Sequence, residues 1–392
     1  MTSCALVMMM TLPGLALFYG GLVRSKNVLS ILMQCLISAG LVSVVWVIFG
    51  YTIAFGEGNA FVGGLAHVGL SGITPDSLSG TIPTYVFVMF QAMFAIITPA
   101  LMIGAFAERM RFGPYLAFIG IWVVVVYAPL AHMVWGGGWI GESGALDFAG
   151  GLVVHMSSGF SALAAAIFLG KRRGYGREPM PPHSLPLTVI GAALLWVGWF
   201  GFNAGSQLAA DGIAALAFLT TNTATGAAVM TWVVVEWLHR GKPTVLGAAT
   251  GAVAGLVAIT PGCAFVSPLG AIAVGVGAGF ICYGAVTLLK PALGYDDSLD
   301  VFGVHGVGGA WGALAAGLFV WSAGAAGPEV SWTAQVPKQL VSIVFTAVFC
   351  PAMTIAILYV LKALFGDLRV TDENEAIGLD LTEHSEGAYT DV

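Results

Sequence analysis

The sequence predicts an all-α polytopic membrane protein, with eleven transmembrane helices arranged as two inverted five-helix repeats plus a C-terminal helix. Composition is the first reason: 58% of the 392 residues are hydrophobic and only 9% are charged, whereas a soluble protein carries roughly a quarter charged residues. The apolar residues form long runs without the strict alternation of barrel strands, which favours helices. The 54 glycines suit packed membrane helices, because small residues let backbones approach closely.

Eleven apolar runs reach the length of about 20 residues that a helix needs to cross the hydrocarbon core. In chain order they lie at about 5–23, 28–55, 84–107, 114–134, 147–170, 186–204, 212–238, 244–262, 267–290, 300–321 and 337–365. No basic segment precedes the first run, so we interpret it as a spanning helix and not as a signal peptide. The membrane domain then covers residues 1–366, and a polar tail covers residues 367–392.

Basic residues predict the orientation of the bundle, because cytoplasmic loops carry an excess of Lys and Arg. With the N-terminus outside, the inside segments contain Arg24, Lys26, Arg109, Arg111, Lys171, Arg172, Arg173, Arg177, Arg240, Lys242, Lys290, Lys362 and Arg369. Only Lys338 then falls outside. We therefore expect the N-terminus outside and the tail in the cytoplasm.

Eleven crossings divide into two halves of five helices, at about 5–170 and 186–321, and a last helix at about 337–365. Because five is odd, corresponding helices of the two halves run in opposite directions. Inverted repeats of this kind place a site at their interface near the membrane midplane. No metal-ligand spacing and no Ser–His constellation occurs, so we expect no cofactor and no enzyme activity. The net charge of −6 gives no indication of nucleic-acid binding.

Two histidines lie inside the corresponding fifth and tenth runs. Asp147 precedes His155 by eight residues, and Asp300 precedes His305 by five. At 1.5 Å per residue, the two rings lie about 12 Å and about 8 Å from opposite ends of the membrane span, which places both in its middle third. A single buried histidine more often bonds a backbone carbonyl. Two histidines at matching positions instead favour a polar pair beside a narrow path.

Both aspartates begin helices, where a carboxylate can cap the N-terminus. Asp147 also lies near the outer surface among apolar residues, where a carboxylate is costly. For Asp147, capping and the attraction of a cation are equally favoured by the sequence.

Aromatic residues and a hydroxyl gather at the outer ends of three helices. Phe90 and Phe94 are four residues apart and share a helix face. Trp135 ends the fourth helix, and Phe202 and Ser206 end the sixth. Aromatic faces can attract a small cation, but an aromatic belt at the membrane interface is also common. Spacing alone favours the belt.

Several long motifs occur in order along nearly the whole chain. They are Pro13–Gly21 with Arg24, Lys26 and Asn27, Ala131–Gly138, Gly144–Gly151 with His155, Gly198–Ser206, and Asp300–Gly309. Together they resemble the ammonium transporter family (Amt/Mep/Rh), in its bacterial Amt branch. The resemblance implies a homotrimer with one pore per subunit that takes up ammonium or ammonia through a bacterial inner membrane.

Within this resemblance each candidate residue has an expected role. His155 and His305 are similar to the family's twin-histidine pair, and Phe94 and Phe202 to its pore gate. The resemblance assigns the outer ammonium site to Phe90, Phe94, Trp135 and Ser206. It places Asp147 beneath that site, as a residue required for the structure. Pore-lining positions correspond to Leu15, Phe18, Tyr19, Leu195, Trp199 and Val301.

The resemblance implies a mechanism in which ammonium binds outside, loses its proton near the Phe gate and crosses as ammonia. Separate transfer of the proton is left open. Two alternatives are an ammonium sensor that signals through a cytoplasmic partner and a channel for carbon dioxide. A cation site at Trp135 and Ser206 argues against the gas channel.

The tail from Gly378 to Tyr389 is similar to the regulatory tail of the family. Its acidic residues (Asp367, Asp372, Glu373, Glu375, Asp380, Glu383, Glu386 and Asp391) would face basic residues of the inner surface (Arg109, Arg111, Lys171, Arg172, Arg173, Arg240 and Lys242). Composition alone favours a disordered segment. The resemblance implies a docked tail that contacts a neighbouring subunit and a trimeric PII-type signal protein.

Overall fold

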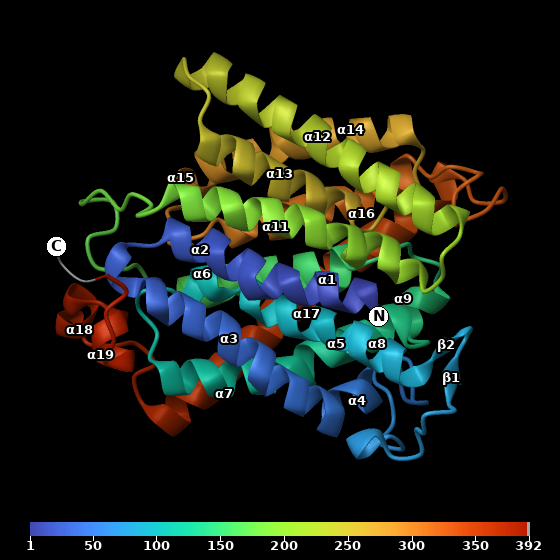
Figure 1. The fold of residues 1–392 in the computed structure, drawn as a ribbon, viewed down its shortest axis with the longest axis horizontal. Coiled ribbons are helices and arrows are strands. Elements are labelled where there is room, and N and C mark those ends of the chain that lie inside the picture. Colours follow the sequence, from blue (N-terminus) through green and yellow to red (C-terminus); the bar gives the residue numbers. More distant parts are fainter. Residues whose placement is uncertain (390–392) are drawn as a thin grey trace.

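The computed structural model describes residues 1–389, which form a bundle of long helices lying side by side (Figure 1). Residues 390–392 of the predicted tail, among them Asp391, lie outside the described residues. The helices up to the middle of the chain are α1 (Thr2–Met9), η1 (Met10–Leu15), α2 (Ala16–Leu22), η2 (Ser25–Asn27), α3 (Val28–Val45), η3 (Trp46–Gly50), α4 (Tyr51–Phe55), η4 (Val68–Leu70), α5 (Thr84–Leu101), α6 (Ile103–Phe106), α7 (Phe112–Trp122), η5 (Val123–Tyr127), α8 (Ala128–Trp135), α9 (Trp139–Glu142), η6 (Gly151–Met156) and α10 (Ser157–Leu169). The later helices are α11 (Leu185–Asn203), η7 (Ala204–Gln207), α12 (Gly212–Arg240), α13 (Val245–Ile259), α14 (Pro268–Gly284), η8 (Ala285–Leu289), α15 (Lys290–Leu293), η9 (Phe302–Gly306), α16 (Val307–Leu318), α17 (Trp332–Phe365), α18 (Asp372–Ile377) and α19 (Leu379–His384).

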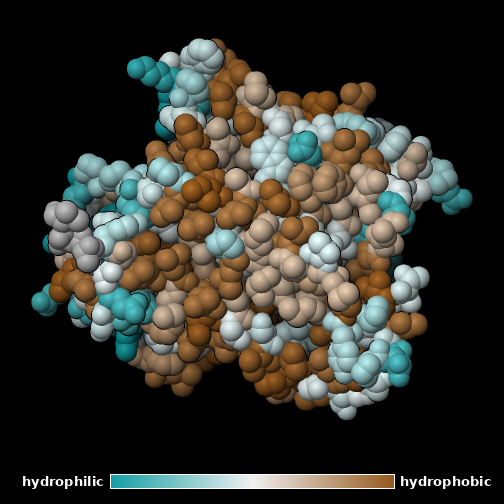
Figure 2. All heavy atoms as spheres, in the orientation of Figure 1, coloured by the Kyte–Doolittle hydropathy of each residue, from teal (hydrophilic) through white to brown (hydrophobic). Residues whose placement is uncertain are grey.

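The eleven predicted runs are all helical. Among residues 1–389, nine helices are long and apolar enough to cross a membrane. The eighth run forms the shorter α13, and the tenth forms η9 followed by α16. Hydrophobic side chains cover the middle of the visible surface, and hydrophilic ones gather toward its ends (Figure 2). The prediction of a multi-pass helical membrane protein is confirmed.

The two ends of the bundle differ. At one end the strands β1 (Leu78–Ser79) and β2 (Ile82–Pro83) pair in an antiparallel hairpin; we call this end the hairpin face. The opposite end carries α18 and α19 and is called the tail face (Figure 1). The hairpin departs from the all-α prediction, but it lies in a surface loop and adds no sheet to the core.

Two predicted helix starts are wrong by several residues. The fifth run was expected to begin at Asp147, but helical structure begins at Gly151. The eleventh was expected to begin near Pro337, but α17 begins at Trp332, because the Ser331 hydroxyl caps it by accepting from the Ala334 N–H. A side-chain cap stabilises a helix start that apolar periodicity does not reveal.

The described tail docks on the tail face of its own chain. The Asp380 carboxylate accepts from the Ser30 N–H at 2.8 Å, at the start of α3. Lys26 Nζ donates to the carbonyl oxygens of Glu375 and Ala376. The Glu375 side chain is buried and accepts from the Arg173 N–H and from Arg369. The tail up to Tyr389 is therefore ordered against the bundle, not free as composition alone would suggest.

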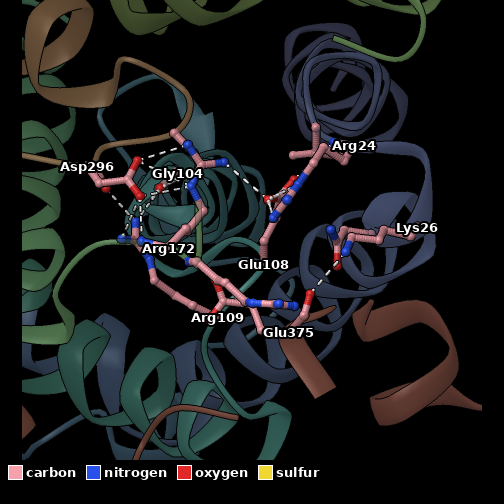
Figure 3. A network of polar contacts seen from close by, with 12 residues as sticks. Arg24, Lys26, Gly104, Glu108, Arg109, Arg172, Asp296 and Glu375 are labelled. Carbon is pink, nitrogen blue, oxygen red and sulfur yellow. Dashed lines mark hydrogen bonds and ion pairs between the residues drawn. The ribbon is translucent and has the colours of Figure 1, made fainter. Parts of the chain in front are cut away.

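A buried ionic cluster lies beside the docked tail and joins loops from both halves (Figure 3). Glu108 accepts from Arg24 and Arg172, and Asp296 accepts from Arg172 and Arg109. Burial alone would raise the pKa of Asp296, but the hydrogen bonds and charge of Arg172 hold that pKa below its ordinary value. Arg109 is 0% exposed, so the expectation that it belongs to a free cationic surface is wrong.

Helices of the two halves cross in backbone contact at Gly159 of α10 and Gly306 of η9. A Cβ atom on Gly159 would meet the backbone nitrogen of Gly306. The two glycines therefore allow a separation between these helices that a larger side chain would prevent.

We predict that Gly159→Ala lowers the thermal unfolding temperature of the purified protein in detergent, because overpacking of a filled core costs about 1–3 kcal/mol. Gly40→Ala is the matched control, since Gly40 is an exposed helical glycine whose Cβ would meet nothing within 4 Å. Equal unfolding temperatures for the two variants would contradict the prediction.

Candidate functional site

The two predicted histidines lie side by side in the centre of the bundle. His155 is on η6 and His305 on η9, and their Nδ1 atoms are 3.2 Å apart. Both rings are buried, at 1% and 4% exposure. Since a neutral imidazole carries one N–H, one Nδ1 donates and the other accepts. His155 Nε2 is buried and has no hydrogen-bond partner within the described residues.

A narrow cavity runs past this pair. Only about 10 Å³ of it is accessible to the centre of a water-sized molecule, roughly the space for one such molecule. The lining residues are Met10, Leu15, Phe18, Tyr19, Ile97, Leu101, Val154, His155, Leu195, Trp199, Phe202, Val253 and His305. Apart from the imidazoles and the Tyr19 and Trp199 rings, the wall consists of aliphatic, Met and Phe side chains, so it offers few hydrogen bonds to a passing molecule.

The structure thus brings five of the six expected pore-lining residues, all except Val301, together around the histidines. The Trp199 ring stacks on His155 with centroids 5.4 Å apart, and its Nε1 donates to the Thr260 hydroxyl. Val301 is buried but lines neither this cavity nor its neighbours, because its side chain packs near Gly104.

A second cavity of about 180 Å³ opens toward the hairpin face. Its lining residues are Phe55, Phe87, Gln91, Phe94, Trp135, Phe148, Ser206 and Leu208. Trp135 Nε1 donates to the Asp147 carbonyl oxygen at 2.8 Å, which fixes the plane of the indole. The Ser206 hydroxyl donates to the Phe202 carbonyl oxygen at 2.7 Å, so its lone pairs remain able to accept.

Two residues of this region differ from the sequence-based expectation. Phe90 packs edge-on against Phe94 with centroids 4.9 Å apart, and it lines a neighbouring groove instead of this cavity. Sequence reasoning missed Gln91, whose Oε1 is buried without a partner. The sequence signal that could have identified Gln91 is its amide, which stands next to Phe90 in an otherwise apolar helix.

Two phenyl rings separate the two cavities. Phe94 and Phe202 stack with centroids 4.1 Å apart and an interplanar angle of 22°. Phe94 lines the hairpin-face cavity and Phe202 the narrow one. Both rings are buried, so a molecule passing from one cavity to the other must displace them.

A third cavity of about 530 Å³ opens at the tail face and reaches His305. It shares Phe18, Tyr19, Val253 and His305 with the narrow cavity. Its wall is polar where it widens, with Glu236, Arg240, Thr287, Ser298 and Asp300 among its lining residues. The three cavities therefore follow one another from the hairpin face to the tail face.

Asp147 caps the helix that carries His155. Its two carboxylate oxygens accept from the N–H groups of Gly150, Gly151, Leu152 and Val153, at 2.6–3.2 Å. Gly150 has a φ of +117°, which a residue with a Cβ adopts only under strain. With four donors on one carboxylate, the geometry favours the capping role over direct contact with a cation.

The matching aspartate of the other half is Asp297 and not Asp300. Asp297 Oδ2 accepts from the Phe302 N–H at 2.8 Å, at the start of η9. The expected capping role of Asp300 is wrong, because its carboxylate pairs with Lys290. Asp297 precedes His305 by eight residues, the spacing between Asp147 and His155. Equal spacing is the signal that sequence reasoning missed.

Comparisons with known proteins show what this chain is similar to. A model of the Ammonium Transporter Family matches residues 1–389. An ammonium transporter of Bacillus subtilis is 52% identical over 394 residues, covering 99% of this chain and 97% of the relative. The crystal structure of Candida albicans Mep2 superposes with a TM-score of 0.88 at 38% identity, over 95% of this chain and 85% of Mep2. A structure titled Sensor Amt Protein has a TM-score of 0.90 at 31% identity, over 98% and 96%.

We predict that Asp147→Asn lowers the free energy of unfolding, because hydrogen bonds to a charged acceptor contribute about 1.5–3 kcal/mol. The Asn amide has only one acceptor oxygen. Its NH2 group would face backbone N–H groups, which are also donors. Denaturant unfolding in detergent measures the loss.

Asp211→Asn is the control, since the exposed Asp211 caps α12 by accepting from Ile213 and Ala214. Its loss should be the smaller of the two, because water can replace the bonds. A loss at Asp211 as large as that at Asp147 would count against a special role for the buried cap.

Proposed function

The chain belongs to the ammonium transporter family, and on that premise we propose that it takes ammonium at the hairpin face and releases it at the tail face, crossing the centre as ammonia. The observation that carries this proposal is the series of three cavities, with the Phe stack between the first two and the imidazole pair along the second. The relatives named as transporters are also closer in sequence than the sensor protein, which favours transport over sensing.

Recruitment would take place in the hairpin-face cavity. The Trp135 and Phe94 rings can attract a cation with their faces. The Ser206 hydroxyl and Gln91 Oε1 can accept hydrogen bonds from N–H groups. A small cation with several N–H donors fits this combination better than a spherical metal ion, which would need more oxygen ligands than the cavity offers.

Ammonium would give up its proton to water in the open hairpin-face cavity, beside the Phe stack, and ammonia would take a proton from water again in the tail-face cavity. A charged ion in the narrow cavity would lose its water and find few partners, at a cost of several kcal/mol or more. Neutral ammonia avoids that cost. His155 Nε2, which is buried without a partner, can accept an N–H from a passing ammonia or donate to its lone pair.

We also propose the direction of uptake and the membrane in which the protein lies. Basic residues concentrate in the loops of the tail face, where the ionic cluster and the docked tail lie, so the positive-inside rule places this face in the cytoplasm. The hairpin face and the N-terminus would then lie outside a bacterial inner membrane. We further propose a homotrimer with one pore per subunit, and a transporter that catalyses no reaction of its own.

We predict that His155→Ala or His305→Ala lowers methylammonium uptake by about 3- to 10-fold or abolishes discrimination against potassium, because a hydrogen bond in the narrow cavity is lost. Uptake is measured in cells lacking other ammonium carriers, with and without competing potassium. His67→Ala is the control, since His67 bonds the Ser71 carbonyl in the loop of the hairpin face. Unchanged flux and unchanged discrimination in both pore variants would refute the pair's role.

The tail would regulate transport by holding the loops of the tail face, and we propose that it also contacts a neighbouring subunit and a PII-type protein. The tail packs closely against the bundle at Gly378. This residue has a φ of +115°, and a Cβ there would lie 2.6 Å from the Lys26 carbonyl oxygen. At its end, the Tyr389 hydroxyl lies 2.9 Å from His183 Nε2.

We predict that deleting residues 367–392 lowers uptake and weakens PII binding in a pull-down, while the protein still inserts into the membrane. Gly378→Ala should reproduce the effect by undocking the tail, whereas Gly387→Ala should not, because a Cβ there would make only an ordinary van der Waals contact, 3.8 Å from the Tyr389 carbonyl oxygen. If the deletion transports and binds PII as the full chain does, the tail has no regulatory role.

A further inference from the structure

His132, one helical turn before Trp135, makes an unusual pair of contacts. Its ring is buried, with Nδ1 3.1 Å from the Ala54 carbonyl oxygen and Nε2 2.8 Å from the Asn59 carbonyl oxygen. A peptide carbonyl only accepts hydrogen bonds, and a neutral imidazole has a single N–H. Both contacts are hydrogen bonds only when the ring carries two N–H groups, that is, as an imidazolium.

The surroundings of the ring suit a positive charge. Ala54 lies in the last turn of α4, where carbonyl groups lack intrahelical partners and the helix dipole is negative. The neighbouring carbonyls are already satisfied, since Thr52 accepts from the Gly56 N–H and Ile53 from the Gly63 N–H. The His132 ring supplies the donor that Ala54 needs.

No carboxylate among the described residues lies within ion-pair distance of the ring, so these carbonyls are its polar partners. The titratable groups on the elements and loops packed around α8 are Tyr51 on α4, Glu57 after it, Tyr127 on η5, Glu142 on α9, Asp147 before η6 and His155 on η6. Of these, Asp147 is already occupied by four backbone N–H groups.

The same residues clamp a loop to the turn that follows Trp135. The His132 carbonyl oxygen accepts from the N–H groups of Gly136 and Gly138, and the Trp139 N–H donates to the Ala60 carbonyl oxygen at 3.0 Å. A Cβ on Gly136 would meet the Ala54 carbonyl oxygen, and one on Gly138 would meet that of Ala60 at 2.8 Å. The loop 54–60 therefore lies directly against the turn 136–138, with the His132 ring between its two ends.

We propose that His132, as an imidazolium, is a positioning residue for the recruitment site: it holds the loop 54–60 against the turn 136–138 and thereby fixes Trp135. This inference rests on the proposed recruitment of ammonium at Trp135. Loss of the proton leaves one ring nitrogen with its lone pair facing a carbonyl oxygen, which opens one side of the clamp. Loss of this clamp lowers the affinity for ammonium.

The test uses the full-length protein in proteoliposomes, with methylammonium uptake measured against concentration. His132→Asn cannot reach both carbonyls as the ring does, so its half-saturating concentration should exceed that of the wild type by about tenfold, the factor that corresponds to about 1.4 kcal/mol, with little change in maximal rate. His67→Asn should follow the wild type.

A second readout does not need transport. In ¹⁵N-histidine-labelled wild type in lipid nanodiscs, one ring should keep both nitrogens protonated near neutral pH, and the signal should vanish in His132→Asn. If every ring is neutral there, the inference is overturned. It is also overturned if His132→Asn has the half-saturating concentration of the wild type, and in that case the proposed transport itself still stands. Absence of uptake in the wild type would instead refute the proposed function.

Discussion

Two buried carboxylates, one toward each end of the bundle, satisfy backbone amides at the starts of η6 and η9, and the position of the histidine pair depends on this interaction. The first N–H groups of a helix have no intrahelical partner, and an unsatisfied N–H away from water costs about as much as a lost hydrogen bond. Asp147 meets that need for η6, and Asp297 meets it for η9. Because each carboxylate is eight residues before a histidine, capping both helices brings the two imidazoles together in the centre of the bundle. Direct attraction of a cation is not needed to explain either aspartate.

Polar groups are distributed unevenly between the hairpin-face cavity and the narrow cavity. The hairpin-face cavity combines aromatic faces with the acceptors of Ser206 and Gln91, which suits a small cation with N–H donors. Beyond the Phe94–Phe202 stack the wall offers mainly the two imidazoles, and the space is that of about one water molecule. A hydrated ion cannot keep its shell there, so the narrow cavity favours a neutral molecule on physical grounds.

The tail face is held together by buried charge. Arg172 bridges Glu108 and Asp296, which belong to loops of different halves, and Arg109 completes the cluster. Removing one member would leave an uncompensated buried charge, which is strongly unfavourable. The tail packs beside this cluster through Glu375 and Asp380. The tail therefore packs beside loops that border the cavity of the tail face.

The sequence by itself determined the class of structure and the main elements. Runs of about 20 apolar residues can only be buried in lipid as helices, and the motifs around His155 and His305 pointed to the right pair because they recur in corresponding runs. Local sequence patterns could not predict which polar groups pair with each other. Asp297 and Asp300 both precede η9, and only the fold shows that one caps the helix while the other pairs with Lys290. Phe90 and Gln91 are adjacent in sequence, yet Gln91 lines the cavity and Phe90 packs behind it. Helical periodicity sets the direction in which a side chain points around the helix axis. Which neighbour that side chain contacts depends on how the helices pack.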